Sequence, residues 1–425
     1  MYRLNKYVSI YDQPEDDVPS LLIFNAMTGG LYKVVGKKRI EVLNFKKNFC
    51  GLLSQETKEF LLKEQVLLVP ETDELLLVKN QFNIERMSKK ELYVTYAMTQ
   101  QCNLRCLYCY QNHADKHIDI QSIDKSIKYV MRNIEGYAAL KVHWFGGEPL
   151  MTLDMLRYAS IKYINMSKEI GFIYSSGVTT NGTLFNPIIA KELKELKVKQ
   201  VQFTLDGVKV IHDKLRAHKT GKGTFNKIID SMKIAAEYNF TIYLRINISK
   251  LNVSSFPVLL DLLIENGLGP EKIFLYLNEL KEHGFSSLYP NLYFDSVVDY
   301  SNTIAQLLKE MKIRGFPLPM LRPIGINCEF DKPSTMLFGT DGNLYHCTTA
   351  TDKPMGKLTE NGELEEKTEL LNRIHNRKPW DDYDCKSCNH LPLCMGGCAY
   401  LEEEVKTKCN PSKFILEPLV KLIAN

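Results

Sequence analysis

Segments with the pattern of strands and segments with the pattern of helices alternate along the chain from residue 91 to about residue 315. The strand-like runs are Leu92–Met98, Lys141–Phe145, Ile173–Thr179, Val201–Thr204, Thr241–Ile248 and Lys272–Leu277. The helix-like segments are Ser122–Ile134, Leu153–Lys168, Ile188–Leu196, Thr224–Tyr238, Ser254–Asn266 and Val297–Lys312. Strands that alternate with helices predict an α/β domain in which the helices cover a parallel sheet.

The first 90 residues have a different pattern, with short strands and a short helix. Tyr7–Tyr11 and Leu21–Asn25 read as strands, and Ser54–Lys63 reads as a helix with Ser54 as its N-cap. Val66–Val69 and Leu75–Val78 read as a hairpin across a turn that contains Pro70. We therefore expect a small α+β domain over residues 1–90.

A third region follows the last helix of the α/β domain. Pro317, Pro319 and Pro323 mark a change of domain there, which sets the α/β domain at 91–315 and the next domain at 316–410. The last residues, 411–425, form an apolar-rich tail that we expect to pack on the body of the protein.

Composition places the chain among soluble globular proteins. Its 425 residues are 44% apolar and 24% charged, which allows two or three domains with sizeable cores. The net charge of +4 is spread over both signs, which argues against nucleic acid as a partner. No signal-peptide pattern opens the chain and no run approaches the ~18 apolar residues of a membrane span, so we expect a cytoplasmic protein without a membrane partner.

Eleven cysteines stand out in a chain expected to be cytoplasmic, where they serve metal or redox chemistry more often than disulfides. Three of them, Cys102, Cys106 and Cys109, follow the first predicted strand with the spacing C-x3-C-x2-C. Three thiolates can hold three corners of a cubic iron–sulfur cluster and leave one iron open. The alternative is a zinc site, which prefers four nitrogen or sulfur ligands.

Polar and glycine-rich motifs follow the next three predicted strands. These motifs are Gly146-Gly147-Glu148, Thr180-Asn181-Gly182 and Thr204-Leu205-Asp206-Gly207. In barrels of β/α units the chemistry gathers at the carboxyl ends of the strands. Glycines let backbone come close to a ligand, and a carboxylate accepts from a cationic amine. Asp206 and Asn247 are either part of this site or turn and strand-end residues, and we expect His113, His143, His212 and His218 to be surface or packed residues.

Seven more cysteines follow residue 316, and isolated Cys50 completes the eleven. They are Cys328, Cys347 in Gly342-x4-Cys347, the run Cys385-x2-Cys388-x5-Cys394-x3-Cys398, and Cys409. A zinc ribbon is the alternative here, but seven thiolates cannot fill two all-cysteine zinc sites without an outside ligand.

The first cysteine loop, with aromatic Tyr108 inside its last spacing, resembles the signature of the radical S-adenosylmethionine (radical SAM) superfamily. The resemblance implies a partial (β/α)6 TIM-type barrel and S-adenosylmethionine (SAM) as a cofactor on the open iron. It implies that Gly146, Gly147 and Glu148 hold the methionine ammonium. Thr204 is then a candidate for the ribose, and either Arg216 or Arg245 for the methionine carboxylate.

The second cysteine group resembles the SPASM extension of radical SAM enzymes, which carries two auxiliary [4Fe–4S] clusters. By position, Cys385, Cys388, Cys394 and Cys409 would ligate the outer cluster. Cys328, Cys347 and Cys398 would hold the inner one, with three cysteines only. The chain would then carry three [4Fe–4S] clusters.

The first 90 residues resemble the winged-helix-like modules that capture leader peptides in peptide-modifying members. A leader would add as a strand to an exposed edge. The alternative is a small cap without a partner. The resemblance implies a maturase of ribosomally made peptides that abstracts hydrogen with a 5′-deoxyadenosyl radical and forms a thioether or another cross-link. Its partners would be a precursor peptide with its leader and a flavodoxin- or ferredoxin-type electron donor.

The second hypothesis is an anaerobic sulfatase-maturing enzyme that makes formylglycine. That group lacks such an N-terminal module and usually has an acid after the Gly-x4-Cys cysteine, where this chain has Thr348. A multi-cluster electron carrier is a third hypothesis, but it would have no use for Gly-Gly-Glu or for a barrel. The residues leave the peptide, the bond and the general base open.

Overall fold

The computed structural model describes residues 2–48, 52–280, 289–323, 332–349, 351, 353–365, 369, 372, 376–398 and 409–424. Cys50 and Cys328, two of the cysteines singled out above, lie outside the described residues. No helix in the described part of the chain is long and apolar enough to cross a membrane.

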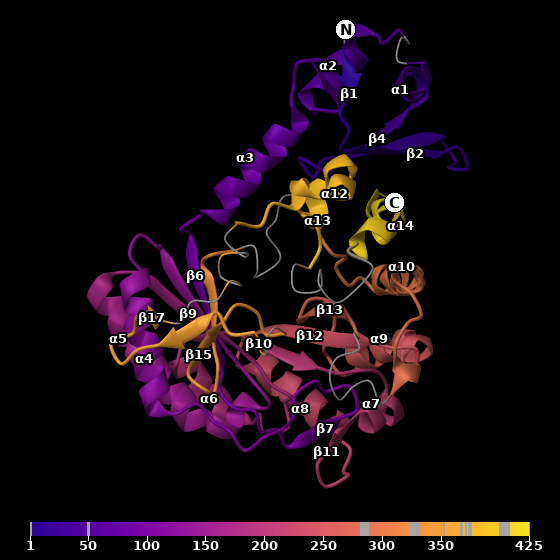
Figure 1. The fold of residues 1–425 in the computed structure, drawn as a ribbon. Helices are drawn as coiled ribbons and strands as arrows, with labels where there is room; N and C mark the ends of the chain where they lie inside the picture. The colour runs from indigo at the N-terminus through magenta and orange to yellow at the C-terminus, as the bar shows by residue number, and fades with distance from the viewer. Residues whose placement is uncertain are drawn as a thin grey trace.

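Six parallel strands form the centre of the molecule (Figure 1). They lie side by side in chain order: β6 (Glu91–Ala97), β8 (Ala139–Phe145), β9 (Ile173–Thr179), β10 (Val198–Thr204), β12 (Thr241–Ile248) and β13 (Ile273–Glu279). The helices between and after them are α4 (Ile120–Asn133), α5 (Leu153–Ile170), α6 (Pro187–Glu195), α8 (Phe225–Glu237), α9 (Phe256–Glu265) and α10 (Val297–Ile313). The predicted α/β domain with a parallel sheet is confirmed.

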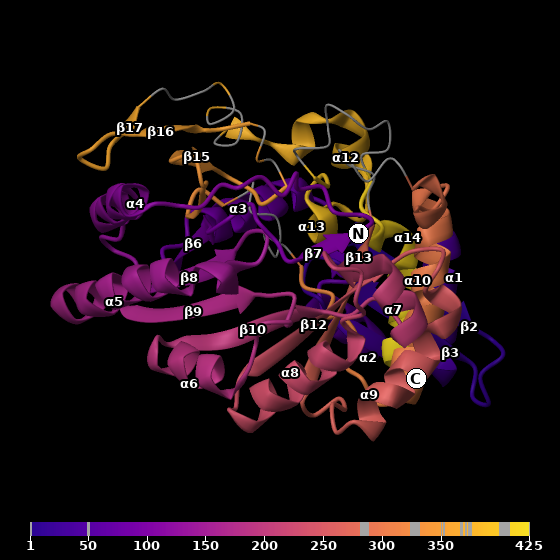
Figure 2. The same cartoon turned by 90° about the horizontal axis from the view of Figure 1, so that it is seen from below.

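The two faces of this sheet differ in burial. On β8, Leu140, Val142 and Trp144 are buried against the helices, whereas Lys141, His143 and Phe145 on the other face are only partly buried. Figure 2 shows α4, α5, α6, α8 and α9 along the outer side. The inner face therefore stays accessible, and the carboxyl ends of the strands open onto it.

The sheet continues into the C-terminal third of the chain. β14 (Thr335–Phe338) pairs in parallel with β6, and β15 (Asn343–Tyr345), β16 (Gly356–Leu358) and β17 (Leu364–Glu365) follow in antiparallel order. The sequence pattern predicted none of these four strands. Cys347 follows β15, which starts level with Tyr96 near the carboxyl end of β6 and runs away from that end.

The N-terminal module contains a three-stranded antiparallel sheet of β2 (Val8–Gln13), β3 (Ser20–Asn25) and β4 (Leu31–Val35). α1 (Gly36–Asn48) and α2 (Gln55–Lys63) follow, and Ser54 caps α2 as predicted, with its hydroxyl accepting from the Thr57 N–H at 3.4 Å. β1 (Arg3–Leu4) pairs with β5 (Leu67–Leu68). The sequence pattern missed β4 and α1.

The predicted hairpin after residue 66 is wrong. Leu75–Val78 belongs to helix α3 (Glu74–Arg86), which Asp73 caps by accepting from the Leu76 N–H at 3.0 Å. Glu74, Val78, Phe82 and Arg86 are all buried, and this spacing of four is that of one helix face. The apolar run at 75–78 is therefore the start of a longer helical pattern, which becomes recognisable only with the later buried residues Phe82 and Arg86.

The N-terminal module, the last cysteine segment and the tail share one core. Tyr7, Phe24 and Phe82 pack there with Trp380 and Leu416. Trp380 precedes α12 (Tyr383–Ser387) and α13 (Leu391–Cys394), and Leu416 belongs to α14 (Ser412–Ala424). Figure 1 shows α14 between the N-terminal sheet and α10. The expectation that the tail packs on the body is confirmed, while the domain limits at 90, 315 and 410 stay predictions.

Candidate active site

The loop that carries Cys102, Cys106 and Cys109 continues from β6 and is anchored to a second short strand. β7 (Leu104–Cys106) pairs antiparallel with β11 (Arg216–His218), which follows α7 (Lys209–Leu215). In this register Cys106 lies opposite Arg216. The sequence pattern did not predict α7 or the β7–β11 pair, which joins the cysteine loop to the segment after β10.

The three thiols of this loop are partly buried and not in disulfides. Burial raises the pKa of Cys102 and of Cys106 to about 11 and also raises the pKa of Cys109. Negative charge on a neighbouring thiol adds to each effect: Cys106 acts on Cys102, Cys109 on Cys106, and Cys102 on Cys109. A cationic group that binds all three would relieve this repulsion.

This set of thiols fits an iron–sulfur cluster. Among the described residues, no three His, Cys, Asp or Glu side chains meet closely enough to hold a single metal ion. A four-iron cluster does not require such a meeting point, because its cysteines bind separate iron corners. The three thiols belong to one short loop, and charge on each raises the pKa of another of the three.

Gly146 and Gly147 lie directly against the backbone of the cysteine loop. The N–H of Gly147 donates to the carbonyl of Thr99 at 2.7 Å, and the N–H of Glu148 donates to that of Gln101 at 2.9 Å. A Cβ on Gly146 would lie 2.5 Å from the Thr99 carbonyl oxygen, and a Cβ on Gly147 would lie 2.0 Å from that of Gln101. The glycines are thus required for packing of the cysteine loop, whatever ligand also approaches them.

We expect Gly147→Ala to displace the cysteine loop. The new methyl group would overlap backbone, which cannot move aside like a side chain, and overpacking of this kind costs about 1–3 kcal/mol or more. The variant should unfold at lower temperature and retain less iron after anaerobic reconstitution. Gly269→Ala is the matched control, because its φ is not positive and a Cβ there would meet only the end of the flexible Glu271 side chain. Equal iron content in the two variants would contradict the role of Gly147 in positioning the cysteine loop.

Glu148 is fully buried beside this contact, and the motif after β9 holds its carboxylate. The Thr180 hydroxyl donates to Oε1 at 2.7 Å, the Asn181 N–H donates to Oε2 at 2.7 Å, and the Leu150 N–H donates to Oε1 at 3.1 Å. Burial raises the pKa of Glu148 to about 7, although these bonds favour the ionised form. Asn181 also donates to Asn103 Oδ1 at 2.7 Å, which ties Glu148 to the cysteine loop.

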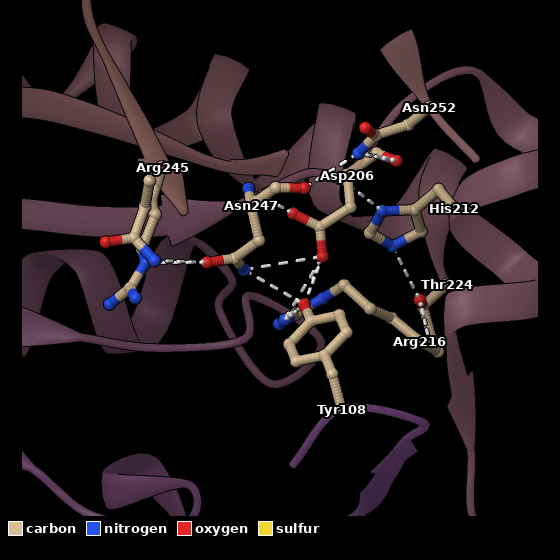
Figure 3. Close-up of polar contacts among 9 residues, drawn as sticks. Tyr108, Asp206, His212, Arg216, Thr224, Arg245, Asn247 and Asn252 are labelled. Atoms are coloured by element: carbon tan, nitrogen blue, oxygen red, sulfur yellow. Dashed lines mark hydrogen bonds and ion pairs between the residues drawn. The ribbon is translucent and has the colours of Figure 1, made fainter. Parts of the chain in front are cut away.

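A second polar cluster lies where β10 and β12 end (Figure 3). The Tyr108 hydroxyl donates to Oδ2 of the buried Asp206 and accepts from Arg216 Nη1 at 2.6 Å and from Asn247 Nδ2 at 3.0 Å. The Asn247 N–H donates to Asp206 Oδ1 at 2.8 Å. The structure thus brings Tyr108 and Arg216, both predicted site residues, into one cluster with Asp206.

The two arginines proposed for the methionine carboxylate differ in their surroundings. Arg216 uses Nη1 on Tyr108 and lies 3.8 Å from Asp206, so its charge is already paired. Arg245 is partly exposed and bonds through Nε to Asn247 Oδ1 at 2.9 Å, and its two terminal nitrogens point away from this bond (Figure 3). Arg245 lies beside Thr204 in the sheet register. Its guanidinium is therefore better placed to accept a ligand.

His212 and Asn252 complete this cluster and were not predicted as site residues. His212 is buried and accepts from the Asp206 N–H through Nδ1 at 3.0 Å, while its Nε2 lies 3.1 Å from the Thr224 hydroxyl. Burial lowers the pKa of His212 to about 3, so it is neutral. Asn252 donates to the Asp206 carbonyl at 3.2 Å. His212 is a packed residue, as expected, and nothing in local spacing connects it to the cysteine loop.

Four cysteines of the second group also lie near one another. Burial raises the pKa of Cys385 to about 11, and charges on Asp382, Cys394 and Cys388 raise it further. Cys394 is affected in the same way by Cys388 and Cys409. Lys413 lies 3.9 Å from Cys409 Sγ, and charge on Cys388, Cys409 and Cys394 raises its pKa.

The other cysteines of the second group are placed differently. Cys347 is partly buried, and the Tyr110 hydroxyl donates to the carbonyl of neighbouring Thr348 at 3.2 Å, so this segment contacts the first cysteine loop. Cys398 is exposed, and Cys328 lies outside the described residues.

Residues 96–263 match the family model of the radical SAM superfamily. This part of the chain is a radical SAM domain, and it contains the cysteine loop, Gly146-Gly147-Glu148 and the cluster around Asp206. Among characterised proteins, the chain is similar to the cysteine-type anaerobic sulfatase-maturating enzyme of Clostridium novyi. The two are 29% identical over 345 residues, which are 70% of this chain and 84% of the relative. Alignments with the first relatives span between 55% and 84% of those proteins.

Two solved structures share the fold. anSMEcpe with bound SAM has a TM-score of 0.63 at 20% identity, over 79% of this chain and 98% of that protein. Streptococcus suis SuiB bound to the precursor peptide SuiA has a TM-score of 0.55 at 13% identity, over 96% of this chain and 98% of that protein. The likeness to SuiB thus spans nearly the whole chain.

Proposed function

We propose that this protein is a radical SAM enzyme that modifies a ribosomally made precursor peptide by forming a thioether or another side-chain cross-link. The observation that carries the proposal is that a radical SAM domain follows an N-terminal module with an unpaired strand edge among the described residues. The fold as a whole is similar to that of peptide-bound SuiB over 96% of the chain. The likeness to anSMEcpe leaves out about a fifth of this chain, which is roughly the length of the N-terminal module.

In this proposal Cys102, Cys106 and Cys109 hold a [4Fe–4S] cluster. When bound there, the cluster and SAM supply abstraction of a hydrogen atom from an unactivated carbon. Glu148 accepts from the methionine ammonium, and Arg245 pairs with the carboxylate through its two terminal nitrogens. Asn247 fixes the orientation of Arg245 before the ligand arrives, which lowers the entropic cost of binding.

The inner face of the sheet would hold the peptide carbon that reacts. His143 accepts or donates with the Thr179 hydroxyl at 2.8 Å and stacks near Tyr93, so its ring orientation is fixed. Tyr243 and Phe274 stack with ring centroids 5.5 Å apart on adjacent strands. These rings line the inner face of the sheet, but Tyr243 and Phe274 lie near the amino ends of β12 and β13, and only His143 is close to a carboxyl end. His143 would therefore be the ring that limits the positions of a bound side chain near the cysteine loop.

The N-terminal module supplies the site for the leader peptide. Within the described residues β4 pairs only with β3, so one edge of β4 is available for a further strand. A hollow of about 500 Å³ lies along β4, with Lys38 of α1 and Phe60 of α2 among its lining residues. An extended peptide can add to such an edge by main-chain hydrogen bonds while its side chains enter the hollow.

The second cysteine group would hold two auxiliary clusters. Cys385, Cys388, Cys394 and Cys409 are our proposed ligands of one cluster, and their mutual electrostatic effects support this grouping. Cys347, Cys398 and Cys328 would ligate the second, beside the first cysteine loop. A flavodoxin- or ferredoxin-type protein would supply the electron for the reaction.

Formylglycine formation in a sulfatase is the second candidate function. The 29% identity to the Clostridium novyi enzyme favours it. Thr348 follows Cys347 at the position where sulfatase-maturing enzymes usually have an acid, and its backbone contacts the cysteine loop through Tyr110. A carboxylate general base is therefore absent from this described position.

The test is mass spectrometry of cysteine-containing peptides encoded beside the gene, co-expressed with the enzyme without oxygen. A product lighter by two hydrogen atoms, with a thiol blocked to alkylation, is the result expected for a thioether. Conversion of a sulfatase peptide, with loss of the cysteine sulfur and gain of oxygen, would support the second function instead. Modification of neither substrate, with SAM cleavage intact, would contradict both.

Val35→Asp separates leader binding from the chemistry in the same assay. Val35 is 45% exposed on β4, and a charge on an edge strand opposes addition of another strand. We expect affinity for the precursor to fall about tenfold or more, or ~1.4 kcal/mol. Ile40→Asp is the matched control, because Ile40 is 55% exposed on α1 and does not line the hollow. Equal affinity of both variants would contradict leader binding at β4.

A further inference from the structure

A buried pair of opposite charges lies directly behind the first cysteine loop. Arg216 is 7% exposed and sits opposite Cys106 in the β7–β11 register. Its Nη1 lies 3.8 Å from Oδ2 of Asp206, which is fully buried. Removing one partner of such a pair leaves an uncompensated buried charge, which is costly. The charges of Arg216 and Asp206 therefore compensate each other only while both side chains are present.

Tyr108 lies between these two charges and belongs to the cysteine loop itself. Its hydroxyl donates to Asp206 Oδ2 and accepts from Arg216 Nη1 at 2.6 Å. Since Tyr108 is one residue from Cys109 and two from Cys106, this contact restrains both thiols. Hydrogen bonds to charged partners are the strong ones, so the hydroxyl is a firm anchor.

Asp206 is held rigidly from its other side. The Asn247 N–H donates to Oδ1 at 2.8 Å, the His212 ring accepts from the Asp206 N–H at 3.0 Å, and Asn252 donates to the Asp206 carbonyl at 3.2 Å (Figure 3). Asp206 therefore cannot follow the cysteine loop if the loop moves. It is a fixed point to which the loop is attached.

One donor of Arg216 stays unused. Nε of Arg216 is buried and has no hydrogen-bond partner among the described residues, and it belongs to the residue that faces Cys106. A buried donor without a partner is unfavourable unless an acceptor is bound there. The sulfur atoms of a cluster bound at Cys106 would be acceptors for this Nε–H group.

We propose that Asp206 is a positioning residue that anchors the cysteine loop through Tyr108 and, by neutralising Arg216, sets the reduction potential of the cluster on Cys102, Cys106 and Cys109. The inference rests on the cluster in the proposed function. Reduction potentials of iron–sulfur clusters depend on nearby charge and on hydrogen bonds to sulfur. Without the Asp206 carboxylate, the Arg216 charge acts unopposed on the cluster and favours the reduced, more negative form.

The test is Asp206→Asn in the anaerobically reconstituted full-length protein. The readout is the midpoint potential of the reduced-cluster electron paramagnetic resonance signal that changes when SAM is added, because that change identifies the cluster on this loop. We expect the midpoint to rise, so that the ratio of reduced to oxidised cluster at a fixed potential increases about tenfold, or about 59 mV for one electron. Asp230→Asn, an exposed change of the same charge on α8, should leave it unchanged.

Tyr108→Phe separates the anchor from the charge. It keeps Arg216 and Asp206, which can then pair directly, but removes the hydroxyl that joins them to the loop. We expect a midpoint near that of the wild type, together with several-fold faster loss of iron to a chelator. If Asp206→Asn takes up no cluster, iron loss from Tyr108→Phe decides, and a rate equal to that of the wild type overturns the proposal.

Two further results would overturn the inference without affecting the proposed function. One is a midpoint in Asp206→Asn that equals that of Asp230→Asn or lies below it. The other is a shift in Tyr108→Phe as large as the one in Asp206→Asn, since charge would then not be its cause. Wild-type protein that shows no SAM-sensitive signal would instead reject the proposed function.

Discussion

Replacing Cys106 with alanine is expected to abolish cleavage of SAM. Cys106 is one of three thiols on one short loop, and its loss would leave two protein ligands where the proposed cluster needs three. The effect should exceed the roughly 10- to 100-fold loss of metal affinity that follows removal of an outer-shell partner. Cys102→Ala and Cys109→Ala should behave in the same way. Production of 5′-deoxyadenosine, measured by chromatography after anaerobic reduction, checks this.

Cys409→Ala is the matched variant for this prediction. Cys409 lies near Cys388 and Cys394, in the second cysteine group, so its loss should leave part of the SAM cleavage intact. Iron content measured in parallel shows whether each variant lost one cluster or all of them. Equal residual cleavage in Cys106→Ala and Cys409→Ala would refute the separate roles of the two groups.

Glu148→Gln is expected to weaken SAM binding by roughly ten- to hundredfold. The amide keeps the shape of the side chain but removes the negative charge that, in the proposed function, accepts from the methionine ammonium. A hydrogen bond to a charged group contributes about 1.5–3 kcal/mol, which gives this range. The dissociation constant of SAM, measured by calorimetry on reconstituted protein, tests the prediction. An affinity within twofold of the wild type would show that the Glu148 charge does not contribute to SAM binding.

The pH dependence of SAM binding provides a second readout for Glu148. Burial raises the pKa of its carboxyl to about 7, although its hydrogen bonds and the nearby Arg216 charge oppose this shift. Only the ionised form accepts from an ammonium, so wild-type affinity should fall about tenfold for each pH unit below 7. Glu148→Gln should show no such fall between pH 6 and 8. A wild-type affinity that is constant over this range would contradict the assignment.

The stability of the protein without cofactors should fall as pH rises, whereas the affinity for SAM should increase. The folded-state pKa of Glu148 lies above its usual value of 4.5, so the folded state prefers the protonated form. The stabilising contribution of this group is complete below pH 4.5 and is lost as pH rises through about 7. Glu148→Gln should therefore flatten the decline in the melting temperature across this interval.

Most of the α/β domain was predictable from its apolar pattern. All six predicted strands and all six predicted helices from 91 to 315 have counterparts in the structure, because each strand of a covered parallel sheet is a compact apolar run with a helical repeat after it. The pattern was less informative where elements are short or lie outside such units. Leu75–Val78 looked like a strand, but the buried residues that followed it, Phe82 and Arg86, made it a helix.

The candidate site was predictable only in part. The cysteine loop and Gly146-Gly147-Glu148 could be recognised because each motif is continuous along the chain and follows a predicted strand. Local spacing contained no sign that Thr180 and Asn181 bind Glu148, or that Arg216 is paired with Tyr108 and Asp206 while Arg245 bonds through Nε alone among the described residues. Those relations depend on which strand ends adjoin and on which partners are already taken.

The sequence by itself determined the type of chemistry this protein can support, because the three thiols and the glutamate occur in short motifs whose spacing does not depend on distant parts of the chain. The tertiary structure decided how those groups are held and charged. Tyr108 and Asp206 are 98 residues apart, and Asp206 and Asn247 are 41 apart. Their contacts exist because neighbouring parallel strands end at one edge of the sheet, and burial at that edge shifts the pKa of Glu148 and pairs Arg216 with Asp206.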